Sequence, residues 1–188
     1  MEPSALLFCV RPRRMGKSLT LSTIQDIYKG EQELFKNTWI GKIPECEWKK
    51  IGTYPVIKIA PPHFISPEPF EENLKGIVRL EAKRLNIELT EGLSSSGMFR
   101  RLISDSAAKA KSKEAVVLID EYDRPLMDCI AEDNNPQLLV DALKIMKRFY
   151  SVIKDVSESI RFCLITGSAK FAKLGLFSSK RYFTHNLL

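Results

Sequence analysis

The hydrophobic positions of the chain form short apolar runs that alternate with longer amphipathic stretches. Four runs, rich in β-branched residues or phenylalanine, cover residues 6–10, 54–60, 115–120 and 161–167. Runs of this length, bounded by proline, glycine or charged residues, predict buried strands. Because the runs are apolar almost throughout rather than alternating, they favour a parallel sheet that is covered on both faces.

The stretches between and after these runs predict helices over residues 16–30, 67–86, 96–113 and 135–156. The first stretch places Leu19, Ile24 and Ile27 on roughly one face and stops at Gly30, which we interpret as a C-terminal cap. The last stretch is the strongest, with Asn135 as its N-cap and apolar residues at helical spacing that predict packing on the core.

Strands that alternate with helices predict an α/β fold, a three-layer α/β/α sandwich around a mostly parallel sheet. The 188 residues fit one domain spanning 1–188, without repeats or linkers. The apolar runs are far shorter than the ~20 residues that span a bilayer, and the N-terminus has no basic leader. We therefore expect no membrane association and a cytoplasmic, or alternatively nuclear, location.

Composition narrows the chemistry only slightly. The four cysteines show no CxxC spacing and are accompanied by two histidines, which favours buried or incidental thiols over disulfides or a zinc site. The net charge of +6 indicates attraction to anions and would permit non-specific contact with nucleic acid, which we do not predict. The densest basic cluster, residues 11–17, coincides with the most informative motif of the chain.

That motif is "VRPRRMGKSLTLS", which joins a predicted strand to a predicted helix. A loop in this position holds phosphates with backbone N–H groups and a lysine, and the hydroxyl after the lysine binds Mg²⁺. The usual first glycine is replaced by Arg11, and Pro12 has no N–H, so the start of this loop must differ. The predicted nucleotide-binding residues are Arg14, Met15, Gly16, Lys17, Ser18 and Leu19.

An acidic pair, Asp120 and Glu121, follows the apolar run "AVVLI". Carboxylates at the end of a buried strand are costly unless a metal, water or hydrogen bonds receive them. We predict that Asp120, with Ser18, holds Mg²⁺ and that Glu121 polarises the attacking water. The alternative is an acidic turn, assisted by Asp123 and Pro125. The second coincidence with a phosphate-binding pattern favours the nucleotide site.

A third strand end carries Thr166, followed by Gly167. A polar side chain at this position can sense the γ-phosphate, which makes Thr166 a candidate catalytic residue. A hydroxyl that forms a local turn hydrogen bond explains the same residue equally well.

The segments "FCVRPRRMGKSLTLSTI", "YPVIKI", "VVLIDEYDRPLMD", "FYSVIKD" and "RFCLITGSAKFAKLGLFS" together resemble the predicted AAA-ATPase-like family, whose members often continue into a PD-(D/E)-x-K nuclease-like domain. The resemblance covers about residues 6–178, and residues 179–188 diverge. In this family the loop itself begins R-P-R-R. The resemblance implies a P-loop fold of the inserted-strand class, with ATP and Mg²⁺ as cofactors. We expect an ATPase core that is truncated at both ends.

The expected function is therefore an ATP-binding, Mg²⁺-dependent ATPase-like domain that couples nucleotide binding or hydrolysis to a protein partner or oligomer. The alternative is a non-hydrolysing or inactive nucleotide-binding or regulatory fragment. Direct nucleic-acid recognition ranks last because no recognised binding motif is present. Arg124, Arg161 and Arg181 are the candidates for an arginine finger.

Overall fold

The sheet has the predicted parallel arrangement. A computed structural model describes residues 5–43, 53–131 and 135–169. These residues form a four-stranded, all-parallel sheet in the order β1-β4-β3-β2. The strands are β1 (Ala5–Val10), β2 (Val56–Ile59), β3 (Ala115–Ile119) and β4 (Ile160–Gly167). Because β4 lies between β1 and β3, the strand order is that of the inserted-strand class.

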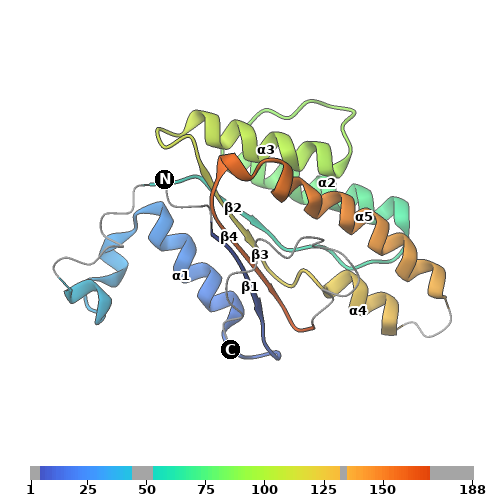
Figure 1. Cartoon of the computed structure of the whole chain (residues 1–188), viewed down its shortest axis with the longest axis horizontal. Coiled ribbons are helices and arrows are strands. Elements are labelled where there is room, and N and C mark those ends of the chain that lie inside the picture. Colours follow the sequence, from blue (N-terminus) through green and yellow to red (C-terminus); the bar gives the residue numbers. More distant parts are fainter. Residues whose placement is uncertain (1–4, 44–52, 132–134, 170–188) are drawn as a thin grey trace.

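Helices cover both faces of this sheet, which confirms the three-layer α/β/α fold (Figure 1). They are α1 (Lys17–Lys29), α2 (Pro67–Arg84), α3 (Ser95–Lys109), α4 (Arg124–Ala131) and α5 (Pro136–Asp155). In Figure 1, α1 lies on one face, and α2, α3 and α5 lie together on the other. Within the described ranges, no helix combines the length and the apolar character needed to cross a membrane.

The helix α4 was not predicted from the sequence, where Asp123 and Pro125 had been considered only as part of an alternative acidic turn. The backbone N–H groups of Leu126 and Met127 both bond to the carbonyl of Asp123, which starts a short helix. Pro125 is tolerated in this first turn because its missing N–H would have had no helical partner there.

The helix α1 confirms one prediction and corrects another. Gly30 caps its C-terminus in the left-handed conformation, with φ of 80°, as expected. The prediction that Leu19 shares the packed face is wrong, since this side chain is 72% exposed, whereas Leu21 is fully buried. At 100° per residue, Leu19 lies about 200° around the helix from Leu21, so the two leucines cannot face the same layer.

The core is divided unequally by the sheet. The larger cluster joins the sheet to α2, α3, α4 and α5, and includes the stacked rings of Phe99 and Phe149, whose centroids are 4.6 Å apart. The smaller cluster, beneath α1, contains Leu21, Val56, Val116, Leu118 and Leu164. Every residue of β3 is buried, which accounts for the continuous apolar run in its sequence.

The outer edge of β2 is closed by side chains of α2. The amide of Lys58 donates to Glu81 Oε2 over 2.9 Å, and Arg84 donates to the carbonyl of Val56. Glu81 and Arg84 also form an ion pair, with 2.6 Å between Oε2 and Nη2. Two of the backbone groups that this edge strand would otherwise leave open, the Lys58 amide and the Val56 carbonyl, are therefore bonded within the domain.

Three cysteines fall in the described part of the chain, and all are free thiols: Cys9, Cys129 and Cys163. Burial raises the pKa of the Cys163 thiol, so this group stays protonated and unreactive. This agrees with the prediction of buried or incidental thiols for these three residues, whereas Cys46 lies outside the described residues.

Candidate functional site

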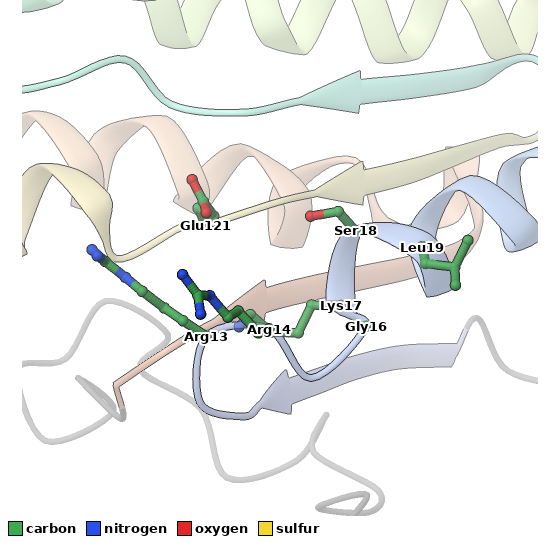
Figure 2. Close-up of a pocket in the computed structure, with 7 residues that line it drawn as sticks. All are labelled: Arg13, Arg14, Gly16, Lys17, Ser18, Leu19 and Glu121. Carbon is green, nitrogen blue, oxygen red and sulfur yellow. The ribbon is translucent and has the colours of Figure 1, made fainter.

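The predicted site residues meet at the carboxyl edge of the sheet. The strand register aligns Cys9 with Thr166 and Val10 with Gly167, while Ile119 is aligned with Ile165. The chain segments that leave β1, β3 and β4 therefore emerge side by side. A cavity of about 500 Å³ opens there, lined by Arg13, Arg14, Gly16, Lys17, Ser18, Leu19 and Glu121 (Figure 2).

Volume alone does not single out this cavity. A cavity of about 460 Å³ lies elsewhere, between residues of α2, α3 and α5. What distinguishes the first cavity is its chemistry, because it combines three basic side chains with the N-terminus of α1. The amides and dipole of a helix N-terminus attract anions.

The loop between β1 and α1 makes its turns at Arg14 and Gly16, which have φ of 66° and 72°. Glycine adopts this left-handed conformation without cost, but for arginine it costs on the order of 1 kcal/mol. The unusual start of the loop is thus accommodated three residues after Arg11. The carbonyl of Gly16 then accepts the first hydrogen bond of α1, from the Thr20 amide over 2.8 Å.

Lys17 is held inside this loop rather than extended into solvent. Its side chain is almost buried, and Nζ donates to the carbonyls of Arg11 and Pro12, each over 2.9 Å. A buried ammonium group requires such acceptors because desolvation without partners is costly. The ammonium group of Lys17 is thus fixed against the backbone of the loop, and Ser18 is the next residue in the sequence.

Ser18, Asp120 and Thr166 form a continuous hydrogen-bonded chain. Ser18 Oγ donates to Asp120 Oδ2 over 2.6 Å, and Thr166 Oγ1 donates to Asp120 Oδ1 over 2.6 Å. Asp120 and Thr166 are both buried. The two hydroxyls offset part of the cost of burying the carboxylate and fix its orientation toward the start of α1.

The hydrogen-bonded side chains of Ser18, Asp120 and Thr166 also present oxygen atoms of the type that bind Mg²⁺. No group of three or more His, Cys, Asp or Glu side chains within residues 5–43, 53–131 and 135–169 could hold a metal ion. The oxygen donors of Ser18 and Asp120 fit the ligand chemistry of Mg²⁺, which commonly takes one or two protein oxygens beside phosphate and water.

Glu121 lies at the end of β3, across the cavity from Gly16, and its carboxylate is turned away from the loop in this view (Figure 2). Its backbone has φ of 49°, another left-handed position that is unfavourable for a residue with a side chain. The carboxylate forms an ion pair with Arg124, at the start of α4. Glu121 thus lines the cavity, while its carboxylate is paired with Arg124, which does not line it.

The predicted residues fall into three groups. Arg14, Gly16, Lys17, Ser18, Leu19 and Glu121 line the cavity. Asp120 and Thr166 lie next to it and connect to it through Ser18. Met15 is 56% exposed and is not among the lining residues. Whether each of them acts on a nucleotide remains a prediction.

The arginine-finger candidates are separated by the fold. Arg124 pairs with Glu121 beside the cavity. Arg161 is the second residue of β4 and lies at the opposite edge of the sheet. There, burial raises the pKa of Tyr28, and the nearby charge of Arg161 offsets part of this rise. Arg181 and the divergent residues 179–188 lie outside the described residues.

The burial and the hydrogen bonds of one residue beside this site, Asp123, were not predicted from the sequence. Asp123 was considered only as part of the alternative acidic turn, yet it is 2% exposed and its side chain bonds to the chain after β4. The available signal was a second aspartate three residues after Asp120, followed by a helical segment. Arg13 lines the cavity as well, in line with the charge expected near an anion.

Comparison with known proteins finds a family whose model covers nearly the whole chain. The model of the family described as "Predicted AAA-ATPase" matches residues 1–177. A curated protein of Azotobacter chroococcum mcd 1, described as an uncharacterized protein in the vnfD 5' region, is 29% identical over 180 residues. That alignment covers 95% of this chain and 33% of the relative, so the chain spans about a third of the relative's length. No solved structure matches the chain.

Proposed function

The chain belongs to the predicted AAA-ATPase family, and on this premise we propose that it is an ATP-binding, Mg²⁺-dependent ATPase domain that couples nucleotide binding or hydrolysis to a partner. Membership of the family indicates a general ATPase-like, nucleotide-binding role. The finer assignment is supported chiefly by one observation, the 2.6 Å hydrogen bond between Ser18 Oγ and Asp120 Oδ2. It joins the first turn of α1 to the acidic residue directly after β3 across 102 positions of sequence.

The loop would bind the phosphates. The amides at the start of α1 and the positive charge of Arg13, Arg14 and Lys17 provide an anion site. Lys17 would exchange its two carbonyl acceptors, on Arg11 and Pro12, for phosphate oxygens. The exchange is favoured because a phosphate oxygen carries a full negative charge, which attracts the ammonium group more strongly than the partial charge of a carbonyl oxygen does.

Ser18 and Asp120 would hold Mg²⁺. The ion, when bound with the nucleotide, supplies positive charge that neutralises the phosphate oxygens and orients them. In the structure the Ser18 hydroxyl donates a hydrogen bond to Asp120, so the two side chains already lie next to each other. Thr166 would keep the other oxygen of Asp120 in place and so fix the direction of its free electron pairs.

Glu121 would orient and polarise the attacking water, which requires its carboxylate to leave Arg124 and turn into the cavity. The ion pair between these two partly exposed side chains is weak enough to exchange, since ion pairs near the surface typically contribute about 0–1 kcal/mol. The same ion pair favours the second candidate function, a domain that binds nucleotide without turnover. In that case Glu121 stays with Arg124.

The decisive experiment is a calorimetric titration with ATP, with and without Mg²⁺, followed by measurement of phosphate release. We expect Mg²⁺ to strengthen binding, and we expect Glu121→Gln to reduce phosphate release by about 100-fold or more without loss of affinity. Glu31→Gln, at an exposed position after α1, is the matched control. Absence of ATP binding contradicts both candidate functions, whereas binding with equal background rates in both proteins favours the non-hydrolysing domain.

A further inference from the structure

A buried carboxylate next to the site has no part in the chemistry proposed above. Asp123 is 2% exposed, and it does not line the 500 Å³ cavity. A carboxylate at this depth is costly unless it is fully hydrogen-bonded. Its bonds therefore indicate which part of the molecule it stabilises.

Asp123 binds the chain immediately after β4. Its Oδ2 atom accepts hydrogen bonds from the Ser168 amide over 2.8 Å, from Ser168 Oγ over 2.7 Å and from the Ala169 amide over 2.7 Å. Charge-assisted bonds to backbone amides are stronger than neutral ones. Two bonds of this kind, together with the bond from the Ser168 hydroxyl, fix the position of residues 168 and 169 relative to the end of β3.

The neighbouring residue, Tyr122, holds the same segment from the other side. Its amide donates to the carbonyl of Thr166 over 3.0 Å, and its hydroxyl donates to the carbonyl of Ala169 over 2.7 Å. The fully buried ring lies directly over Gly167, where a Cβ atom would stand 2.4 Å from a ring carbon. No side chain fits at position 167, so the two segments approach as closely as their backbones allow.

Thr166 connects these hydrogen bonds of Tyr122 and Asp123 to the candidate site. The residue is held at its carbonyl by Tyr122, and its hydroxyl orients Asp120, which in turn binds Ser18. The amide of Arg11, at the start of the phosphate-binding loop, donates to the carbonyl of Gly167 over 3.1 Å. The segment that Asp123 immobilises thus contacts both the loop and the acidic strand end.

We infer that Asp123 is a positioning residue, which acts through Ser168 and Thr166 to hold Asp120 in the orientation that hydrolysis requires. This inference rests on the proposed ATPase function. Asp123 touches neither the cavity nor Lys17, so it controls the rate of hydrolysis rather than the affinity for nucleotide.

The test compares Asp123→Asn, Ser168→Ala and Thr166→Val in the full chain. Asparagine replaces the charged acceptor by a neutral one, and Ser168→Ala removes one of the three donors while leaving both amides. We expect kcat to fall about tenfold in Asp123→Asn and two- to fivefold in Ser168→Ala. The Kd for ADP, measured by calorimetry, is expected to stay within twofold of the wild-type value.

Asp128→Asn is the matched control, since Asp128 also accepts a backbone amide, from Phe64, but it holds the segment after β2. We expect this variant to keep its kcat. An equal loss of kcat in Asp128→Asn, or a parallel loss of ADP affinity in Asp123→Asn, overturns the inference.

A double-mutant cycle separates a positioning role from a merely structural one. If Asp123 acts through Thr166, the doubly substituted chain is no slower than the slower single variant, because the two changes remove one and the same constraint. Losses that multiply to about 100-fold overturn the inference. If Asp123→Asn does not fold, the cycle of Ser168→Ala with Thr166→Val decides by the same criterion. Failure of the proposed function itself would be visible in the wild type, which would release phosphate no faster than Lys17→Ala.

Discussion

The two halves of the candidate site are held in different ways. At the strand ends, Asp120 and Thr166 are buried, and Asp120 accepts hydrogen bonds from Thr166 and from Ser18, each over 2.6 Å. In the loop, Arg13 and Arg14 are exposed, and Lys17 bonds to carbonyls of the loop itself. The strand-end half is already arranged by the protein, whereas the loop half has to exchange its internal bonds for those of a ligand.

This difference indicates how the two halves contribute to binding and to catalysis. Groups that are fixed before the reaction stabilise a transition state without further reorganisation. Groups that must rearrange contribute to affinity only after the cost of breaking their earlier bonds is subtracted. We therefore expect substitutions in the loop to change mainly the affinity, and substitutions at the strand ends to change mainly stability and rate.

The largest effect is expected for Lys17→Ala. The substitution removes the one buried cation of the loop's described residues, which would face the phosphates, and charged hydrogen bonds contribute about 1.5–3 kcal/mol each. We expect the Kd for Mg·ATP, measured by calorimetry, to rise at least about 100-fold. Lys144→Ala, on the exposed side of α5, is the control. Unchanged affinity in Lys17→Ala contradicts the assignment of the loop.

The second largest effect is expected for Gly167→Ala, at the strand ends. The added methyl group would lie 2.4 and 2.5 Å from two carbons of the buried Tyr122 ring. Overpacking of this kind costs about 1–3 kcal/mol, and we expect the free energy of unfolding in urea to fall by about 2 kcal/mol. Gly76→Ala is the matched control, because its Cβ in α2 would meet no atom within 4 Å. There we expect a gain of about 0.5–1 kcal/mol, and equal effects at both glycines contradict the close approach.

Thr166→Val tests the rigid half by removing a hydroxyl at nearly constant volume. Asp120 loses the donor to Oδ1, and we expect kcat to fall about tenfold, equivalent to about 1.4 kcal/mol, with nucleotide affinity nearly unchanged. Thr23→Val is the control, since that hydroxyl bonds only to its own helix, at the carbonyl of Leu19. A loss of affinity with normal kcat would reverse the roles of the two halves.

The smallest effect is expected for Arg14→Gly in the loop. Relief of the left-handed strain at φ of 66° stabilises the folded chain, by up to about 1 kcal/mol in urea unfolding. Arg13→Gly is the matched control, because no positive φ is recorded for Arg13 among the described residues. It is expected to lower the stability by about 0.5 kcal/mol through the entropy of the unfolded chain. Equal changes in both variants would remove the evidence for strain.

The sequence predicted those features that depend on local pattern. The four apolar runs became the four strands, and Gly30 and Asn135 became caps at the ends of α1 and α5. The loop and the acidic strand end were predicted to meet because parallel strands place their carboxyl ends at one edge. The bond between Ser18 and Asp120 confirms that proximity.

Features that the types and spacing of residues do not determine could not be predicted in the same way. Leu19 was assigned to a packed face because the position of α1 on the sheet was unknown. The pairing of Glu121 with Arg124 and the left-handed backbone of Arg14 follow from the local path of the chain, which residue types alone do not determine. Asp123 had a recognisable position in sequence, but its partners, Ser168 and Ala169, lie 45 and 46 residues away.

The closed edge of β2 limits how this domain can associate with other polypeptides. A foreign strand that sought to extend the sheet on that side would first have to displace Glu81 from the amide of Lys58 and Arg84 from the carbonyl of Val56. Those two side chains also attract each other, so both bonds would have to break together. Growth of the sheet past β2, and with it fibre-like stacking of copies through this strand, is thereby opposed by the domain's own second helix.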